Sequence, residues 1–329
     1  MAISVLIKKM IRLNKQRCYF LLALTLISLS TWGQKSSFDL IPLGVKGGTD
    51  ESNMSCYMLG PSGSEQFVAL DAGTVYAGLQ KAVAQKTFAL TASQVMRKYI
   101  KGYFISHPHL DHVSGLIINS PGDTAKSIYA TQKCMNIMQE HYFNDKTWVN
   151  FGDAGLGVLL KKYHYATLPL EKEEKISNTD MTVKAFSLSH IEPFESTAFL
   201  IKHQDSYVLY LGDTGPDELE KAGKLKNLWK NIAPLIQNRQ LKGILIEVSF
   251  PNEQPNHLLF GHLTPQWLMK EMSILADLAG KENMKGLNVV ITHLKPPTIN
   301  EQKIIEQVKA QNSLGLNIIF PQQGEKIKL

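Results

Sequence analysis

The chain has 329 residues, of which 44% are hydrophobic and 19% are charged, and this composition excludes a globally disordered protein. Its 35 Lys and Arg residues outnumber its 29 Asp and Glu residues, but five of the basic residues and none of the acidic ones lie before residue 34. The rest of the chain therefore has 30 basic and 29 acidic residues, and its net charge of +1 argues against binding to nucleic acid through bulk charge.

The first 33 residues have the pattern of a secretory signal peptide. A basic stretch ends at Arg17, an apolar run covers residues 18–29, and small or polar residues precede Gln34. The apolar run is shorter than the about 20 residues that a membrane-spanning helix needs. We expect cleavage near Gly33-Gln34 and export to the periplasm, with no stable membrane association afterwards; an uncleaved membrane anchor is the alternative.

The remaining residues, 34–329, predict one α/β domain without a linker or an internal repeat. Short apolar segments separated by turn residues predict strands, and segments with helical spacing or capping signals predict helices. In chain order we expect strands at 38–43, 56–59 and 67–70, a helix at 92–100, strands at 103–106, 181–187, 196–202 and 207–211, a helix through 225–235, a strand at 243–247, a helix from 264 to about 278, a strand at 289–292 and a helix at 298–311. Strands that alternate with helices in both halves indicate a layered α/β architecture.

Three of the predicted helices begin with a capping signal. Thr91 or Ser93 is the expected N-cap of the first helix, and Thr264, which precedes a proline, is the expected N-cap of the third. Thr298 with Glu301 three residues later has the spacing of a capping box at the last helix.

Three histidines and an aspartate follow the strand predicted at 103–106. His107, His109, Asp111 and His112 lie within six positions, and the end of a strand can direct such side chains toward one point. Imidazole nitrogens and carboxylate oxygens are the ligands that zinc and similar metals prefer. The spacing lets the two alternating histidines bind one ion and the next pair bind a neighbouring one. A surface histidine run, or a single metal site without catalysis, is the alternative.

This cluster resembles the His-x-His-x-Asp-His signature of the metallo-β-lactamase superfamily. The superfamily's other elements follow in order at the ends of predicted strands, at Asp71, His190, Asp213 and His293. The resemblance covers nearly the whole chain after the leader. It implies an αββα sandwich, in which two mixed sheets are flanked by helices.

The resemblance also implies a ligand set for two divalent metal ions. One ion is expected on His107, His109 and His190, the other on Asp111, His112 and His293, and Asp213 is expected to bridge them. Asp71 is expected to support the site without binding metal. Zn²⁺ is the expected metal, and Mn²⁺ or Fe would fit the same ligands. Such a pair of ions can hold a hydroxide and bind a phosphoryl group.

Longer segments resemble the class II 3′,5′-cyclic-nucleotide phosphodiesterases. They are residues 107–121, 261–265 and 291–296, and Gly44 with Gly47-Gly48. This resemblance implies hydrolysis of cyclic AMP (cAMP), cyclic GMP (cGMP) or both to 5′-nucleotides by the bridging hydroxide, with Asp111 counted among the catalytic residues. At residues 148–150 the family has a Trp-Pro-Asn-like element, and here Val149 replaces the proline, although no expected ligand is affected.

His262 and Glu247 are further candidate catalytic residues. His262 is not needed to complete either ligand set and lies just before a predicted helix. Metal-dependent phosphodiesterases of the tRNA 3′-processing group have a similar histidine and a nearby glutamate. By that resemblance, His262 is expected to donate a proton to the leaving ribose oxygen or to bind the phosphate, and Glu247 is expected to orient it. A purely structural histidine is the alternative.

Other functions remain open at this point. The same ligand set also occurs in general phosphodiesterases, thioesterases and lactonases, and a metal- or nucleotide-binding protein without turnover is a second alternative. RNA cleavage is disfavoured by the near-neutral chain, and a homodimer is left open. Cys56 and Cys134 could pair in an oxidising compartment or remain separate buried thiols.

Overall fold

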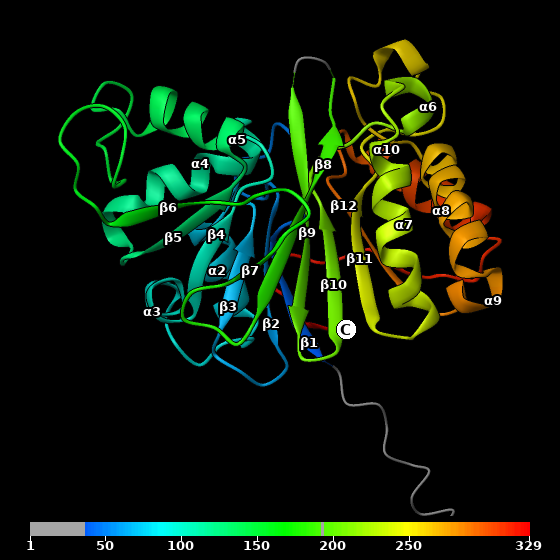
Figure 1. The fold of residues 1–329 in the computed structure, drawn as a ribbon, viewed down its shortest axis with the longest axis horizontal. Helices are drawn as coiled ribbons and strands as arrows, with labels where there is room; N and C mark the ends of the chain where they lie inside the picture. Colours follow the sequence, from blue (N-terminus) through cyan, green and yellow to red (C-terminus); the bar gives the residue numbers. More distant parts are fainter. Residues whose placement is uncertain (1–36, 192–193) are drawn as a thin grey trace, which may run out of the picture. The chain divides into compact units, whose positions relative to one another are not determined.

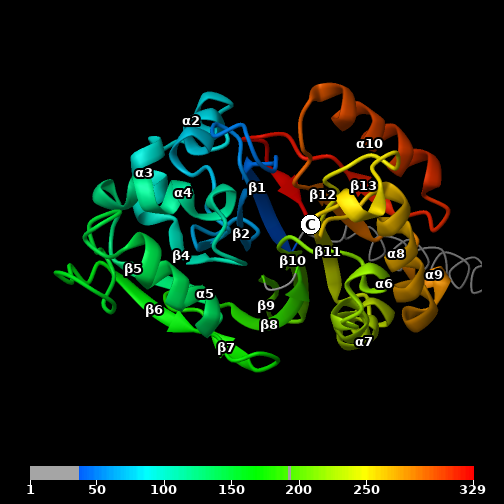
Figure 2. The same cartoon turned by 90° about the horizontal axis from the view of Figure 1, so that it is seen from above.

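The computed structural model describes residues 37–191 and 194–329, so the signal peptide predicted at 1–33 lies outside the described residues. Two seven-stranded sheets pack against each other, and helices cover both outer faces (Figures 1 and 2). This arrangement confirms the predicted αββα sandwich. None of the helices in the described ranges combines the length and the apolar character that crossing a membrane requires.

The first sheet has the strand order β14-β1-β2-β3-β4-β5-β6. Its pairs are antiparallel from β14 to β3 and parallel from β3 to β6. The strands are β1 (Phe38–Gly44), β2 (Cys56–Pro61), β3 (Phe67–Leu70), β4 (Ile100–Phe104), β5 (Lys126–Ala130), β6 (Tyr163–Thr167) and β14 (Ile327–Lys328). The helical segments of this half are α2 (Tyr76–Ala84), α3 (Ala92–Lys98), α4 (Leu110–Asn119), η1 (Ser120–Gly122), α5 (Gln132–Ile137) and η2 (Met138–Tyr142).

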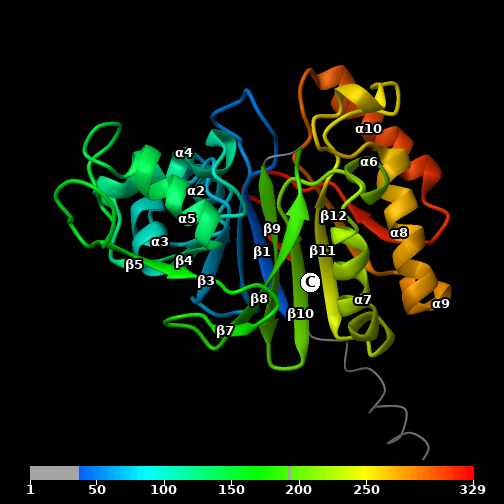
Figure 3. The same cartoon turned by 45° about the horizontal axis from the view of Figure 1, so that its top comes forward.

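The second sheet has the order β13-β12-β11-β10-β9-β8-β7 and is mixed in the same way. Its strands are β7 (Glu173–Lys175), β8 (Thr182–Ser189), β9 (Glu195–His203), β10 (Ser206–Leu211), β11 (Leu241–Glu247), β12 (Asn288–Thr292) and β13 (Asn317–Ile319). Its helices are α6 (Asp217–Glu220), α7 (Lys224–Gln237), η3 (Asn256–Leu258), α8 (Pro265–Ala279), α9 (Lys281–Met284) and α10 (Thr298–Gln311). Figure 3 shows α7, α8 and α10 on the side of this sheet that faces away from the first one.

Side chains from a single strand enter two different cores. In β3, Phe67 packs under the helices of the first half, whereas its neighbour Val68 packs between the two sheets. In β11, Ile244 and Leu245 divide in the same way between the outer helices and the interlayer core. Successive strand side chains point to opposite faces, so strands that are covered on both faces are apolar at nearly every position.

The strands that lead to the candidate site end at one edge of the sandwich. β3 and β4 are parallel, β10, β11 and β12 are parallel, and β8 runs with β10 because both pair antiparallel with β9. A predicted site residue lies at the carboxyl end of each of these strands or up to three residues beyond it. In open α/β sheets, ligands bind at the carboxyl ends of strands, so this edge is where a site is expected.

Two predicted boundaries near the histidine cluster are wrong. The helix predicted at 92–100 ends at Lys98, and the strand predicted at 103–106 spans Ile100–Phe104. Ile100 pairs with Phe67 of β3, so tertiary strand pairing ends the helix earlier than local propensity suggests. The residues after His109 are also helical, because α4 begins at Leu110.

The capping predictions have different outcomes. Thr91 accepts a hydrogen bond from the backbone N–H of Gln94 at the start of α3, and the hydroxyl of Thr264 caps α8. The capping box predicted at the last helix is wrong: Thr298 is the first helical residue, and Glu301 pairs with the ammonium of Lys46 at 3.0 Å.

The two cysteines of the described chain do not form a disulfide. Cys56 and Cys134 are both free and buried. Of the two alternatives that the sequence left open, the structure therefore supports separate buried thiols.

Candidate metal centre

The seven predicted metal ligands meet at the carboxyl edge of the strands. They are His107, His109, Asp111, His112, His190, Asp213 and His293. Two of them come from the loop after β4, two from the first turn of α4, and three from the ends of β8, β10 and β12. The site is thus built by both sheets together.

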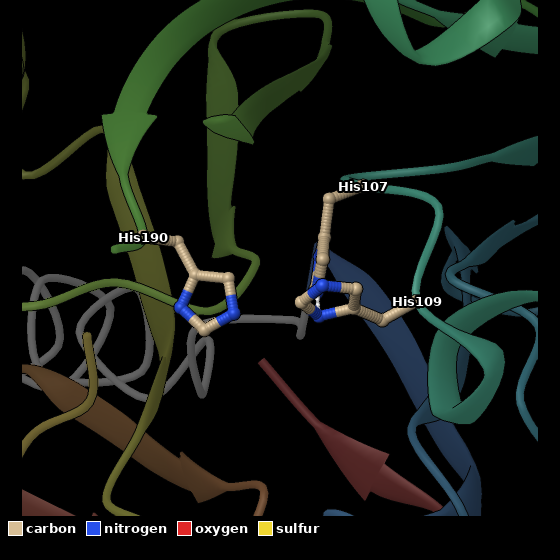
Figure 4. Close-up of side chains that lie close together, drawn as sticks. All are labelled: His107, His109 and His190. Carbon is tan, nitrogen blue, oxygen red and sulfur yellow. Dashed lines mark hydrogen bonds between the residues drawn. The ribbon is translucent and has the colours of Figure 1, made fainter. Parts of the chain in front are cut away.

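The first predicted triad is a compact group. His107, His109 and His190 each offer one ring nitrogen, and these three atoms lie within 4.8 Å of one another. His107 Nε2 and His109 Nδ1 are 3.0 Å apart. Figure 4 shows the ring of His190 facing the other two rings from the opposite side. Three convergent imidazoles are a recurrent ligand set for zinc.

The second predicted triad lies beside the first. One oxygen of Asp111 and one ring nitrogen each of His112 and His293 also lie within 4.8 Å of one another. Asp111 Oδ2 is 3.2 Å from His293 Nε2 and 3.9 Å from His112 Nε2. Since α4 begins at Leu110, its first turn presents both Asp111 and His112 to the site.

Asp213 lies between the two triads and is almost fully buried. Its Oδ2 is 3.4 Å from His112 Nε2 and 3.3 Å from His293 Nε2 in the second triad. The same oxygen is 3.8 Å from His107 Nε2 and 3.9 Å from His190 Nε2 in the first triad. Asp213 Oδ2 therefore faces donor atoms of both triads.

Asp71 supports the cluster through hydrogen bonds to residues around it. Its carboxylate accepts hydrogen bonds from the N–H and the hydroxyl of Ser106, each at 2.7 Å, and from the hydroxyl of Tyr210. It also accepts from His112 Nδ1 at 2.7 Å, which leaves His112 Nε2 directed at the cluster. That Nε2 is buried and has no hydrogen-bond partner within residues 37–191 and 194–329. A buried polar atom without a partner is costly, and a metal ion would satisfy it.

The protonation of the first triad also suits a metal. Burial is the main cause that lowers the pKa of His107, His109 and His190 below the ordinary value of histidine. A neutral imidazole has the free lone pair that a metal requires. Together with the donor types, this shows that the residues present fit a centre for divalent metal ions.

Two glycines press closely on the second triad. A Cβ at Gly47 would lie 2.2 Å from the ring of His293, so no larger residue fits there. The N–H of Gly48 donates to Asp111 Oδ2 at 2.9 Å. The sequence indicated this Gly-Gly pair only through family resemblance, and the contacts now give its physical reason.

His262 and Glu247 are brought together with residues that the sequence analysis missed. His262 Nδ1 is 2.8 Å from Glu247 Oε1, and the hydroxyl of Ser249 donates to Glu247 Oε2 at 2.7 Å. On the other side of the ring, Lys295 Nζ is 2.9 Å from His262 Nε2. The only sequence signal for Lys295 was its place two residues after His293, in a segment noted for another reason.

The electrostatics of this group follow from burial. Burial, with the nearby charge of Asp213, raises the pKa of Glu247 to about 7, and burial lowers the pKa of His262 well below its ordinary value. His262 is also near enough to His190 and Asp213, and to Glu247 and His293, to belong to two further metal-type groups. The ammonium of Lys295 lies beside His262 Nε2, and its positive charge argues against a metal ion bound at that nitrogen.

The substitution at Val149 lies outside this cluster. Val149 is about half exposed, whereas Asn150 is fully buried and its amide donates to the carbonyls of Ala154 and Leu156. Asn150 therefore shapes its own loop.

Comparisons with known proteins agree with this geometry. A sequence model of the family described as cAMP phosphodiesterases class-II matches residues 38–324. A 3′,5′-cyclic-nucleotide phosphodiesterase from Aliivibrio fischeri is 42% identical over 310 residues, covering 90% of this chain and 94% of that relative. The crystal structure of unliganded yeast PDE1 matches with a TM-score of 0.79 at 24% identity, covering 89% of this chain and 100% of that chain. The metallo-β-lactamase fold protein YhfI from Bacillus subtilis matches with a TM-score of 0.56 at 17% identity, covering 88% of this chain and 99% of that chain, so the fold of this chain is that of the metallo-β-lactamases.

Proposed function

We infer that this chain, which belongs to the family of class-II cAMP phosphodiesterases, hydrolyses 3′,5′-cyclic nucleotides to 5′-nucleotides in a metal-dependent reaction. The observation that carries this conclusion is the family match over residues 38–324, since that range includes every residue of the His/Asp cluster. The cluster supports it chemically, because its donors suit metal ions that act on phosphodiesters.

We propose that the cluster holds two ions, most readily zinc. His107, His109 and His190 would hold one ion, Asp111, His112 and His293 the other, and Asp213 both. The histidine-rich donor set suits zinc, and manganese or iron would accept the same ligands. Bound ions would supply Lewis acidity toward the phosphoryl oxygens and would lower the pKa of water.

The chain's own residues prepare this site before a substrate arrives. Asp71 fixes the tautomer of His112 by accepting from Nδ1, and Gly48 fixes one oxygen of Asp111. Ser106 donates to Asp71 and is 3.0 Å from His107 Nδ1, so the same network orients a ligand of each triad. Such outer partners maintain the geometry of metal ligands and their basicity.

The reaction requires one proton at the leaving oxygen. Water is added across the P–O3′ bond: its oxygen bonds to phosphorus, O3′ takes a proton and becomes the ribose hydroxyl, and the 5′-phosphate remains on the nucleotide. We propose that His262 and Lys295 hold that proton. With Nδ1–H of His262 donated to Glu247, Nε2 accepts from the ammonium of Lys295, so the pair, and not His262 alone, faces the leaving oxygen.

Substrates with different leaving groups test this role. Proton donation contributes roughly 10²–10⁴-fold to such reactions. We expect His262→Ala and Lys295→Met to lose turnover of cAMP on this scale while they retain most turnover of a bis(4-nitrophenyl) phosphodiester, whose leaving group needs no proton. An equal loss for both substrates would show that the two residues bind the phosphate instead.

The function itself is tested with purified protein and two cyclic nucleotides. The protein is incubated with cAMP and cGMP separately, and products are separated by chromatography with and without a chelator. Formation of 5′-nucleotide that stops on chelation and returns with zinc supports the proposal. A protein that holds two ions, converts neither nucleotide and hydrolyses a simple phosphodiester or a thioester would instead be another hydrolase of this fold.

We also propose that the protein is exported. The support is the sequence pattern of residues 1–33, with its basic start, apolar run and small residues before Gln34. The expected result is a protein in the periplasmic fraction whose N-terminal residue is Gln34. Recovery of the intact N-terminus in the membrane fraction would favour an uncleaved anchor.

A further inference from the structure

A hollow of 190 Å³ opens beside the candidate metal centre. Its lining comes from the residue after His190, from Pro216 and the end of α6, and from the loop before α8. Ile191, Asn256, Phe260, Gly261 and His262 are among the residues that line it. His262 lines the hollow and also pairs with Lys295 at the proposed position of the leaving oxygen, so a ligand in the hollow would lie next to the reacting bond.

Two apolar residues on the rim are held in unfavourable backbone conformations. Phe260 has a φ of 52° and is 53% exposed, and Ile191 has a φ of 43° and is 38% exposed. Positive φ is rare for bulky side chains and rarer still for β-branched ones. Such strain persists only where the surrounding structure enforces it, and it concentrates at functional sites.

Contacts between the two loops enforce these conformations. The carbonyl of Gly261 is 3.0 Å from His190 Nδ1, and a Cβ at Gly261 would lie 2.5 Å from the backbone nitrogen of Ile191. The loops therefore touch backbone to backbone, which fixes Phe260 and Ile191 on the same rim. Solvent-exposed apolar side chains that are held in this way next to a reactive centre indicate a surface for an apolar ligand group.

The size and polarity of the hollow define that group. Sites for whole drug-sized ligands measure about 300–1,000 Å³, so a hollow of 190 Å³ suits one portion of a nucleotide. Asn256 adds a polar function: the indole N–H of Trp267 donates to its Oδ1 at 3.0 Å, which leaves the amide N–H groups to donate elsewhere. A flat ring with acceptor nitrogens would fit this volume and would accept a hydrogen bond from the amide.

We propose that this hollow binds the purine base of the cyclic nucleotide, with the base stacked on Phe260 against Ile191 and a ring nitrogen accepting from the amide of Asn256. The inference rests on the proposed function, which places the ribose 3′ oxygen at His262. Because the base is attached to that same ribose, it lies within reach of the hollow, which His262 also lines.

The first test compares substrates with and without a base. The kcat/KM for cAMP is divided by that for methyl riboside 3′,5′-cyclic phosphate, which keeps the ribose and the cyclic diester. Stacking of a base on an aromatic ring implies that Phe260→Ala lowers this ratio roughly 5- to 100-fold. Phe260→Tyr, which keeps a ring, should retain it. Leu258→Ala is the matched control, since Leu258 is a 39% exposed apolar residue of the same loop outside the lining.

Asn256→Asp tests the polar contact separately. The aspartate keeps an acceptor for the indole of Trp267 but loses the amide donor. We expect a lower ratio for cAMP over the base-free substrate, roughly 5-fold or more, from the lost hydrogen bond. An unchanged ratio in both Phe260→Ala and Asn256→Asp would overturn the base site while the phosphodiesterase activity stands.

A binding measurement keeps the two proposals distinguishable. Calorimetric titration of adenosine into the metal-loaded protein needs no turnover, because adenosine has no phosphodiester bond. Binding that weakens in Phe260→Ala but not in Leu258→Ala supports the base site even if neither cyclic substrate is hydrolysed, a result that would defeat the proposed function alone. Equal binding of adenosine by both variants and the unaltered chain would overturn the base site.

Discussion

Replacing Asp71 with asparagine should destabilise the fold and weaken metal binding, although Asp71 is not expected to bind a metal ion itself. Its carboxylate accepts four hydrogen bonds in a fully buried environment, three at Oδ2 and one at Oδ1. Asparagine presents an amide N–H group on one side, so at least one donor must face another donor. Losing one bond to a charged acceptor, about 1.5–3 kcal/mol, and orphaning its donor, about 1–3 kcal/mol, gives a loss of roughly 3–5 kcal/mol.

The effect on metal binding should be separable from this loss of stability. His112 no longer has a fixed tautomer in Asp71→Asn, so we expect affinity for one of two ions to fall about 10–100-fold. The assay is competition with a chromophoric chelator, alongside urea unfolding of the metal-free protein. Asp39→Asn is the control, because Asp39 is also buried and accepts from Ser62, Gly63 and Lys326, away from the cluster. Normal metal affinity in Asp71→Asn would refute the proposed support of His112.

Three further predictions concern glycine packing, pH and metal removal. Gly47→Ala should abolish the binding of one of the two metal ions, because the added Cβ would meet the ring of His293. Gly122→Ala, whose Cβ would have no atom within 4 Å, should retain both ions, and the metal content of each variant measures this. Burial is the main cause that raises the pKa of Glu271, so from about pH 4.5 upward the folded state retains a proton that the unfolded state releases. The unfolding free energy should therefore fall as the pH rises across that window. Glu271→Gln should remove this slope in urea titrations. With free metal held at 100 times its dissociation constant, chelation should lower the unfolding free energy by about 2.7 kcal/mol for each bound ion, and readdition of metal should restore the thermal midpoint.

The parts of the fold that could be predicted are the strands that are covered on both faces. β1, β3, β10 and β12 match their predicted ranges to within two residues, because most of their residues are apolar and turn residues bound them. The same strands indicated part of the candidate site, because Asp71, Asp213 and His293 come just after β3, β10 and β12. Local sequence was therefore sufficient to propose where the site would form.

The parts that could not be predicted depend on distant contacts. α4 begins directly after His109 without a side-chain cap, so no local signal marked its start, yet it positions Asp111 and His112. The last helix shows the opposite error, since Glu301 has the spacing of a capping residue but is drawn to Lys46 instead. Similarly, Lys295 reaches His262 only because two separate loops meet, which no spacing along the chain reveals.

The division of the ligands between two sheets links metal binding to the packing of the whole sandwich. Asp71 follows β3 in the first sheet, and Tyr210 reaches it from β10 in the second, with its ring in the interlayer core. This hydrogen bond ties the two sheets together directly beneath His112. A change in the packing between the sheets would move the two halves of the ligand set relative to each other, and a bound ion would resist that movement. Because the folded arrangement alone brings these ligands together, the free energy of metal binding also stabilises the contact between the sheets.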